Sequence, residues 1–203
     1  DGEFRLQGGA FEGSPFDSAA MTAFACYDLE NVKSVAFDVV VTRPKGAAYR
    51  APGAPMSVYG VESVVDEVAL KIGMDPIEFR LKNAVRDGSQ SSYGPKFGPN
   101  GLVETLEAAK AHPQYKTPLG PNQGRGIASG FWFNYGGETC SNLNINADGT
   151  VTLAVGTPDI GGSRASMCMM AAEELGIPYD SVRATVVDTG ALGFNEGSYG
   201  SRV

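Results

Sequence analysis

Glycine and proline constrain this sequence more than any other feature, because both residues interrupt regular secondary structure. The 203 residues include 27 glycines and 12 prolines, so about one position in five bends or ends a regular element. Apolar residues make up 42% and charged residues 19%, a balance that is typical of a globular protein and not of a disordered one. The sequence therefore predicts one domain or two small ones with a buried core.

The number and distribution of charged residues argue against a nucleic acid partner and against a membrane span. Sixteen basic and 23 acidic side chains give a net charge of −7, and the chain has no run of basic residues. Such a chain repels a phosphate backbone, so we expect no nucleic acid partner. Charged residues interrupt every apolar stretch well short of the ~20 residues that a membrane span needs, so we expect no membrane span.

The cysteines are sparse and unpaired in sequence. Cys26, Cys140 and Cys168 form no C-x-x-C motif, which argues against a disulfide framework and predicts a reducing compartment, the cytoplasm. The chain begins at Asp1 without a signal peptide and ends at Val203 without a tail. We therefore expect an internal fragment of a longer protein.

Three segments before residue 113 have the pattern of helices. Residues 55–73 carry apolar residues at the spacing of one buried helical stripe: Val58, Val61, Val65, Val68, Ala69 and Ile72. Asp75 is a typical N-cap, and Pro76 suits the first position of a second helix that continues to about residue 85. Residues 102–111 predict a third, short amphipathic helix.

Strands and helices are segregated along the chain, which predicts an α+β fold with helices packed on mixed or antiparallel sheets. A proline-rich segment at residues 113–121 is the expected boundary between a first subdomain, residues 1–115, and a second, residues 122–203. The second should contain a strand meander, a glycine-rich turn, a helix and a last strand. The predicted strands are residues 4–7, 32–41, 124–135, 140–146, 150–155 and 182–187, with a helix at 163–175.

Common catalytic residues are few. The single histidine, His112, ends a polar helix beside a proline with no nucleophile nearby, which favours a solvated helix end over a general base. One histidine and scattered cysteines argue against a zinc site, so we name no metal ligand. The acidic residues within predicted helices are expected to face solvent: Asp66, Glu67, Glu173 and Glu174.

A glycine-rich turn at residues 159–166 follows a predicted strand and opens a predicted helix. Free amides at a helix start can hold an anion. An ordinary strand-to-helix turn with Ser163 as its N-cap would have the same residues, and the spacing alone favours that interpretation. G-x-G-x-x-G and the P-loop lysine are both absent, which argues against a dinucleotide-binding fold.

Two further loops could contact a ligand. Residues 197–202 combine small residues with two serine hydroxyls, and Arg202 could bind a phosphate through two donors, although a plain surface turn would look the same. Residues 48–55 place Arg50 in a loop of proline and glycine directly before the long helix. A helix-entry turn with an exposed arginine is the equally good alternative.

The order and spacing of these segments resemble the molybdenum hydroxylase family. The resemblance is to the molybdopterin-binding large subunit of xanthine dehydrogenases and aerobic carbon monoxide dehydrogenases, and it covers nearly the whole chain. It is closest to the carbon monoxide dehydrogenase-like branch, because of residues 197–202. The segments that carry it are residues 27–32, 48–55, 62–83, 159–178, 188–189 and 197–202.

The resemblance implies a function. Family members bind molybdenum through a pterin, often as a cytosine dinucleotide in bacteria, hydroxylate a carbon with oxygen from water, and pass electrons to [2Fe-2S] clusters and FAD on partner subunits or domains. Arg50 would line the pocket of a small organic substrate beside the metal and is the candidate catalytic residue. The implied cofactor-binding residues are Gly161, Gly162, Ser163, Ser198, Tyr199, Gly200, Ser201 and Arg202.

The sequence also departs from the family pattern. Ala51 stands where members that oxidise carbon monoxide have a copper-bound cysteine, so an aldehyde or N-heterocycle is the expected substrate of the parent enzyme. Gly162 stands where the family usually has glutamine. The catalytic glutamate should follow Val203, and another cofactor loop should precede this segment. We therefore expect the isolated fragment to be inactive. The alternative is a non-catalytic assembly or interaction module that retains the fold.

Overall fold

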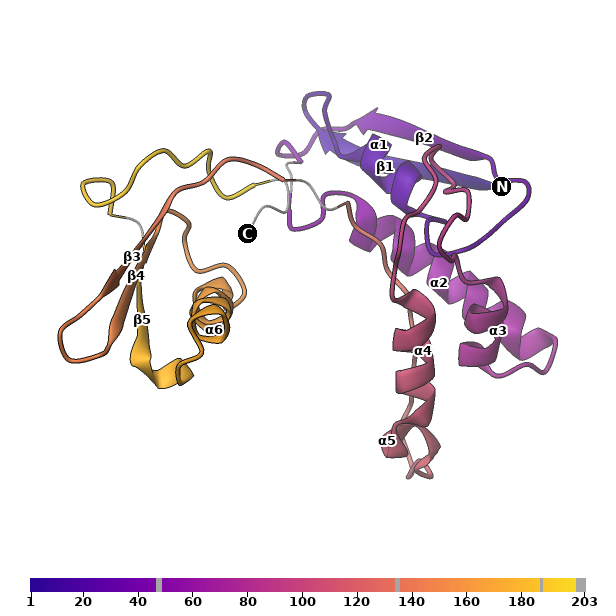
Figure 1. Cartoon of the computed structure of the whole chain (residues 1–203). Coiled ribbons are helices and arrows are strands. Elements are labelled where there is room, and N and C mark those ends of the chain that lie inside the picture. Colours follow the sequence, from indigo (N-terminus) through magenta and orange to yellow (C-terminus); the bar gives the residue numbers. More distant parts are fainter. Residues whose placement is uncertain (47–48, 134–135, 187, 200–203) are drawn as a thin grey trace. The chain divides into compact units, whose positions relative to one another are not determined.

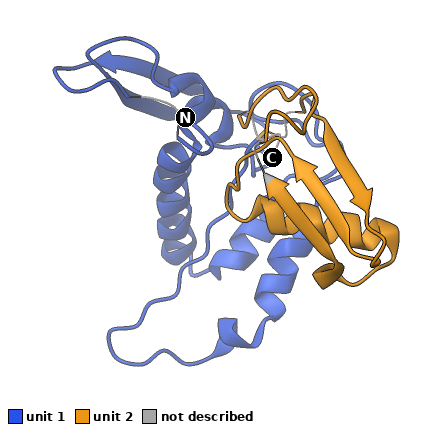
Figure 2. Cartoon of the chain, turned by 90° about the vertical axis from the view of Figure 1, so that its left-hand side faces the viewer, with its two compact units in different colours: residues 1–132 blue, residues 133–203 orange. Residues whose placement is uncertain are grey.

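The computed structural model describes residues 1–46, 49–133, 136–186 and 188–199 (Figure 1). The chain divides into two compact units, Asp1–Trp132 and Phe133–Val203, coloured blue and orange in Figure 2. The chain contains helices and two sheets, one of which is mixed, and four helices follow one another between β2 and β3. The fold is therefore α+β, as predicted.

The two units meet further along the chain than the proline-rich segment at residues 113–121, which lies inside the first unit. Part of that segment forms a short helix, α5 (Pro113–Lys116). Tyr115 and Ile127 pack on the same buried cluster as Ile77, and Arg125 donates hydrogen bonds to the carbonyl oxygen atoms of residues 115 and 117. These contacts hold residues 113–127 against the helices that precede them.

The first unit begins with two parallel strands, β1 (Gly2–Gly9) and β2 (Ser34–Val40). Helix α1 (Phe16–Thr22) connects them and packs on both. The strands were predicted, but the helix was not. Its signal is a proline at position 15 followed by Asp17 in the first turn, a combination that favours a helix start.

Helices α2 (Ala54–Lys71), α3 (Pro76–Asn83) and α4 (Leu102–Ala111) follow, close to their predicted bounds. The predicted stripe on α2 is wrong at its C-terminal end, where Val68 is 38% and Ile72 is 58% exposed. The fully buried positions of α2 are Ala54, Ser57, Glu62 and Ala69. Most of these are small residues, which let α2 pack closely against α1 and α3.

Asp75 caps α3 as the sequence predicts. Its carboxylate accepts hydrogen bonds from the amides of Ile77 (2.8 Å) and Glu78 (3.1 Å) and from the hydroxyl of Tyr115 (2.7 Å). Burial pushes the pKa of Asp75 upward, but the three hydrogen bonds, that of Tyr115 foremost, outweigh it and hold this pKa below its usual value. Asp75 therefore joins α3 to the segment that follows α4.

Replacing Asp75 with alanine is expected to lower the free energy of unfolding of the first unit by about 1–2 kcal/mol at neutral pH, the cost of losing an N-cap. Because the pKa of Asp75 is lower in the folded chain, its contribution is complete above the unfolded pKa and is lost as pH falls through the folded pKa. Urea unfolding at neutral pH and at about pH 2, well below the ordinary pKa of aspartate, measures both effects. Asp87→Ala, which removes an exposed carboxylate, is the control. A loss that stays equal in acid would contradict this assignment.

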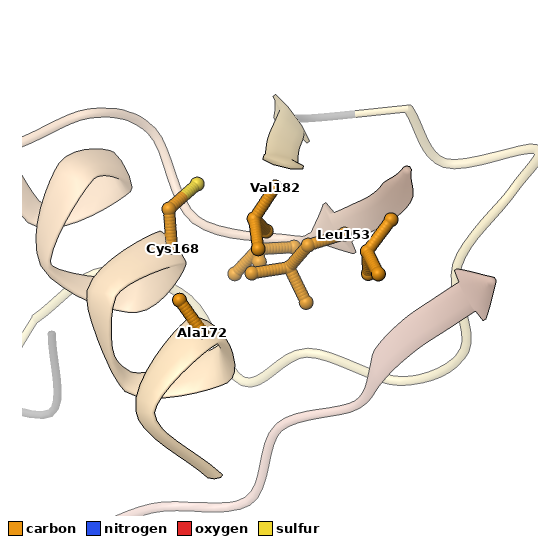
Figure 3. Close-up of a cluster of buried hydrophobic side chains, with 6 residues drawn as sticks. Leu153, Cys168, Ala172 and Val182 are labelled. Carbon is orange, nitrogen blue, oxygen red and sulfur yellow. The ribbon is translucent and has the colours of Figure 1, made fainter. Parts of the chain in front are cut away.

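The second unit is a three-stranded sheet with the order β3-β4-β5. Strands β3 (Ser141–Ile145) and β4 (Val151–Val155) are antiparallel, whereas β5 (Val182–Val186) is parallel to β4. Helix α6 (Ser163–Leu175) and a short 3-10 helix, η1 (Tyr179–Ser181), connect β4 to β5. Figure 3 shows Cys168 and Ala172 of α6 facing Leu153 and Val182, in a core that also includes Val151 and Val155.

The strand predicted at residues 124–135 is wrong for its described part, because residues 124–133 form no strand. The amide of Ser129 donates instead to the buried carboxylate of Glu62 (2.7 Å), so this extended segment is bonded to a helix and not to a sheet. Within the described residues, no helix combines the length and the apolar character that crossing a membrane requires.

Candidate functional site

Arg50 lies in the loop that enters α2. Its side chain is exposed and makes no hydrogen bond or ion pair with any described residue. The next residue, Ala51, has a φ of 55°, a left-handed conformation that costs a residue with a side chain about 1 kcal/mol or more. The loop therefore holds a strained backbone beside an unpaired guanidinium.

Gly53 fixes this loop against α1. Its φ is 83°, and a Cβ atom here would lie 2.2 Å from the carbonyl oxygen of Pro15 and 2.9 Å from the amide of Ala19. Only glycine permits this approach of the two backbones. The amide of Ser57 then donates to the carbonyl oxygen of Gly53 (3.2 Å), so the loop leads directly into the first turn of α2. Arg50 is thereby presented from a rigid support.

A buried carboxylate ties the helices of the first unit together. Glu62 is 5% exposed, and its oxygen atoms accept hydrogen bonds from Tyr27, from Nε of Arg80 (2.9 Å) and from the Ser129 amide. Arg80, which is 1% exposed, also pairs with Asp66 (2.8 Å). We call Tyr27, Glu62, Arg80 and Ser129 the Glu62 network.

The Glu62 network changes the chemistry of its neighbours. Burial, together with the Glu62 charge, raises the pKa of the Cys26 thiol to about 12, although Arg80 opposes the shift, so this thiol is neutral at physiological pH. Burial and the hydrogen bond to Glu62 also raise the pKa of Tyr27 above its usual value. The Glu62 network was not predicted from the sequence. A signal for it exists, since Glu62 and Arg80 lie among the residues that form the inner faces of two adjacent predicted helices.

The helix after the glycine-rich turn at residues 159–166 does not have Ser163 as its N-cap. Gly162 (φ 84°) is the N-cap of α6, and Ser163 is the first helical residue, its hydroxyl accepting a hydrogen bond from the amide of Ile160 (3.1 Å). Gly161 (φ 62°) precedes Gly162, and the amides of these two glycines donate no hydrogen bond to a described residue. No atom lies within 4 Å of a Cβ built on Gly162. The turn therefore has two amides without an acceptor among the described residues, and the space on the Cβ side of Gly162 is open.

The carboxylate of Asp159 lies at the N-terminus of the same helix, α6. Its carboxylate accepts from the Arg164 amide (3.1 Å) and lies 3.3 Å from the Arg164 guanidinium. One donor of the first turn is therefore already satisfied, and a carboxylate lies where an anion would approach.

The C-terminal loop is described only in part. The hydroxyl of Ser198 is buried and has no hydrogen-bond partner among the described residues. Tyr199 is 62% exposed, and its hydroxyl bonds to Glu196 (3.0 Å). The other three predicted residues, Gly200, Ser201 and Arg202, lie outside the described residues.

The remaining candidate residues have ordinary structural roles or face solvent. His112 is exposed, and its Nδ1 atom accepts from the amide of Gln114 (3.3 Å), so it caps α5. Glu67, Glu173 and Glu174 are exposed as expected, but Asp66 is half-buried against Arg80. In the part of the chain that the structure describes, His, Cys, Asp and Glu side chains form no group of three that could hold a metal ion.

The amides of Gly161 and Gly162, at the positive end of the α6 dipole, and the buried hydroxyl of Ser198 have no acceptor among the described residues. Donors of this kind suit an oxygen-rich anion, whereas the Asp159 carboxylate at the same helix start does not. Two family models, each described as "Molybdopterin cofactor-binding domain", match residues 1–84 and 103–203. The chain belongs to this family of molybdopterin cofactor-binding domains.

Similar proteins and a similar solved structure support this assignment. The chain is 33% identical to the putative xanthine dehydrogenase molybdenum-binding subunit of Escherichia coli K12, over 78% of this chain and 23% of that protein. It is 29% identical to the aldehyde oxidoreductase of Megalodesulfovibrio gigas, over 88% of this chain and 21% of that protein. The crystal structure of the aldehyde oxidoreductase from Desulfovibrio desulfuricans superposes with a TM-score of 0.62 and 27% identity, over 92% of this chain and 22% of that one. The chain spans less than a quarter of the length of these relatives.

Proposed function

We propose that the protein carrying this chain is a molybdenum hydroxylase that oxidises an aldehyde or an N-heterocycle with oxygen from water. The observation that carries the proposal is Arg50, an exposed and unpaired guanidinium on a strained loop that Gly53 fixes in place. The family assignment and the relatives named for xanthine and aldehyde oxidation support it.

The residues have separate roles in this proposal. A bound molybdenum–pterin would supply the oxidation chemistry. The amides of Gly161 and Gly162 and the hydroxyl of Ser198 would donate hydrogen bonds to it. The neighbouring Ser163 and Tyr199 would shape the two loops, and residues 200–202 would add contacts to a dinucleotide form. Arg50 would orient the substrate through its guanidinium donors.

Electron transfer would need partners, which we propose to be [2Fe-2S] and FAD subunits or domains. The cytoplasm is the proposed compartment, and the three cysteines, which are all free, agree with it.

The test compares two arginines in the molybdenum-loaded protein that contains this chain. Arg50→Met is expected to lower kcat/KM for an aldehyde or N-heterocycle by about 100-fold, the range for losing a charged contact to a reacting substrate, with molybdenum content unchanged. Arg43→Met removes another exposed arginine and should leave kcat/KM unchanged. Equal kinetics of the two variants would remove Arg50 from the mechanism.

One observation favours the second candidate, a non-catalytic assembly or interaction module. Asp159 already caps the turn that would hold the cofactor, which gives the turn a structure of its own without a ligand. In either case we propose that the isolated chain neither binds the cofactor well nor turns over substrate. Metal analysis of the purified chain tests this, and stoichiometric molybdenum would contradict it.

A further inference from the structure

The first unit contains an apolar cavity of about 390 Å3 that the proposed function does not use. One wall is a face of α4, from Leu102 to Ala109, and another is the extended segment of residues 127–131. The rest of the lining comes from Ala25, Cys26, Val85, Phe97 and Asn100. The volume lies within the range of about 300–1,000 Å3 that is usual for small-molecule sites.

The side chains that line the cavity favour an uncharged ligand. The lining contains no lysine, arginine, histidine, aspartate or glutamate, and its polar side chains are those of Asn100, Thr105 and Ser129. The Cys26 thiol in the wall is neutral at physiological pH. A charged ligand would lose its hydration here without gaining a counter-charge, which is costly.

Aromatic rings define part of the cavity shape. Phe97 and Phe131 meet edge to face, with centroids 5.6 Å apart and an interplanar angle of 75°. Tyr93 packs on both rings, at 6.2 and 5.6 Å. Aromatic walls of this kind favour a flat aromatic ligand, which can pack against them with offset or edge-to-face geometry.

Both walls are held in place without a ligand. Leu106 of α4 is 4% exposed in the cluster around Ile77. The opposite segment is bonded through the Ser129 amide to the buried carboxylate of Glu62. A preformed cavity binds at low conformational cost, because its walls are ordered before the ligand arrives.

We propose that this cavity binds an uncharged, flat aromatic small molecule between α4 and residues 127–131. The lining shares no residue with the Arg50 loop or the glycine turn, so the inference does not depend on the proposed oxidation chemistry.

The test uses the full chain and an uncharged acyl-(dimethylamino)naphthalene dye, whose emission shifts to the blue in apolar surroundings. One dye per chain is expected to bind. Ala109→Phe places a ring inside the cavity and should weaken binding by about tenfold or more, corresponding to ~1.4 kcal/mol. The matched control, Ala108→Phe, adds the same ring at an exposed position of the same helix outside the lining and should keep the wild-type affinity. An anilinonaphthalene sulfonate, which carries a negative charge, should bind more weakly than the uncharged dye.

A second measurement does not depend on the folding of a variant. Hydrogen exchange of the wild-type chain with the uncharged dye should show slower exchange in α4 and residues 127–131 and no change in α6. The proposal is overturned if the uncharged dye does not bind, if protection appears elsewhere, or if a folded Ala109→Phe chain binds like the control.

Discussion

Replacing Glu62 with glutamine is expected to destabilise the first unit by about 3 kcal/mol, the scale for removing one partner of a buried ion pair. The reason is that Arg80, 1% exposed, would keep its charge and lose the carboxylate that bonds its Nε atom. The half-exposed Asp66 would remain as the only carboxylate paired with Arg80 among the described residues. Urea unfolding followed by the fluorescence of the single tryptophan, Trp132, measures the loss.

Glu67 supplies the matched control for Glu62. It lies on the same helix, its side chain is exposed, and Glu67→Gln should change the free energy of unfolding by less than about 0.5 kcal/mol. The double variant Glu62→Gln, Arg80→Met should recover part of the loss, because it removes the uncompensated charge. The ion pair would have no special role in stability if the Glu62 and Glu67 variants unfolded at the same urea concentration.

Replacing Gly53 or Gly60 with alanine should change the free energy of unfolding in opposite directions. Gly53→Ala is expected to cost about 2 kcal/mol or more, since the new Cβ would lie 2.2 Å from the carbonyl oxygen of Pro15 at a positive φ. Gly60→Ala, inside α2 with nothing within 4 Å of the new Cβ, should stabilise the helix by about 0.5–1 kcal/mol. Urea unfolding measures both changes.

Limited trypsin digestion reports on the loop itself. Arg50 is an exposed cleavage site whose susceptibility depends on how tightly Gly53 holds the loop against α1. Cleavage after Arg50 should be faster in Gly53→Ala than in the wild type and unchanged in Gly60→Ala. Identical digestion patterns in all three proteins would show that the packing of Gly53 does not fix the Arg50 loop.

Local signals explain which elements could be predicted. Asp75 followed by Pro76 is both a cap and a helix start, and the structure places α3 there. The turn at residues 148–149 joins β3 and β4 because Gly149 adopts a φ of 82° and the Asp148 side chain accepts from the amide of Thr150 (2.9 Å). Neither feature needs information from a distant part of the chain.

Long-range contacts explain the errors. Residues 124–133 have the apolar pattern of a strand, but their position is set by the bond between Ser129 and Glu62, which are far apart in sequence. On α2, Val68 and Ile72 fit a helical stripe but are exposed, whereas Glu62 is buried because Arg80 and Tyr27 neutralise and solvate it. Periodicity cannot identify such a partner.

The candidate site also combines features with a local sequence signal and features that depend on long-range contacts. The glycine-rich turn could be predicted from its place between a strand and a helix, and the structure gives Gly161 and Gly162 a positive φ. Their role in cofactor binding rests on the family resemblance and stays a prediction. The family resemblance placed Arg50, but the strain at Ala51 and the packing of Gly53 on α1 depend on backbone geometry that the sequence does not show. The role of Asp159 as a competing cap was likewise invisible, since it depends on the side chain folding back onto Arg164.

The hydrogen bond from Ser129 to Glu62 also bears on how this protein can be divided. The first family match ends at residue 84 and the second begins at residue 103, yet the donor for Glu62 belongs to the second. A chain cut between the two matches would leave a buried oxygen atom without its main-chain donor and would uncover Ile77 and its neighbours. The bounds of the two family matches therefore differ from the bounds of the two compact units, and an expression boundary placed after Trp132 follows the compact units.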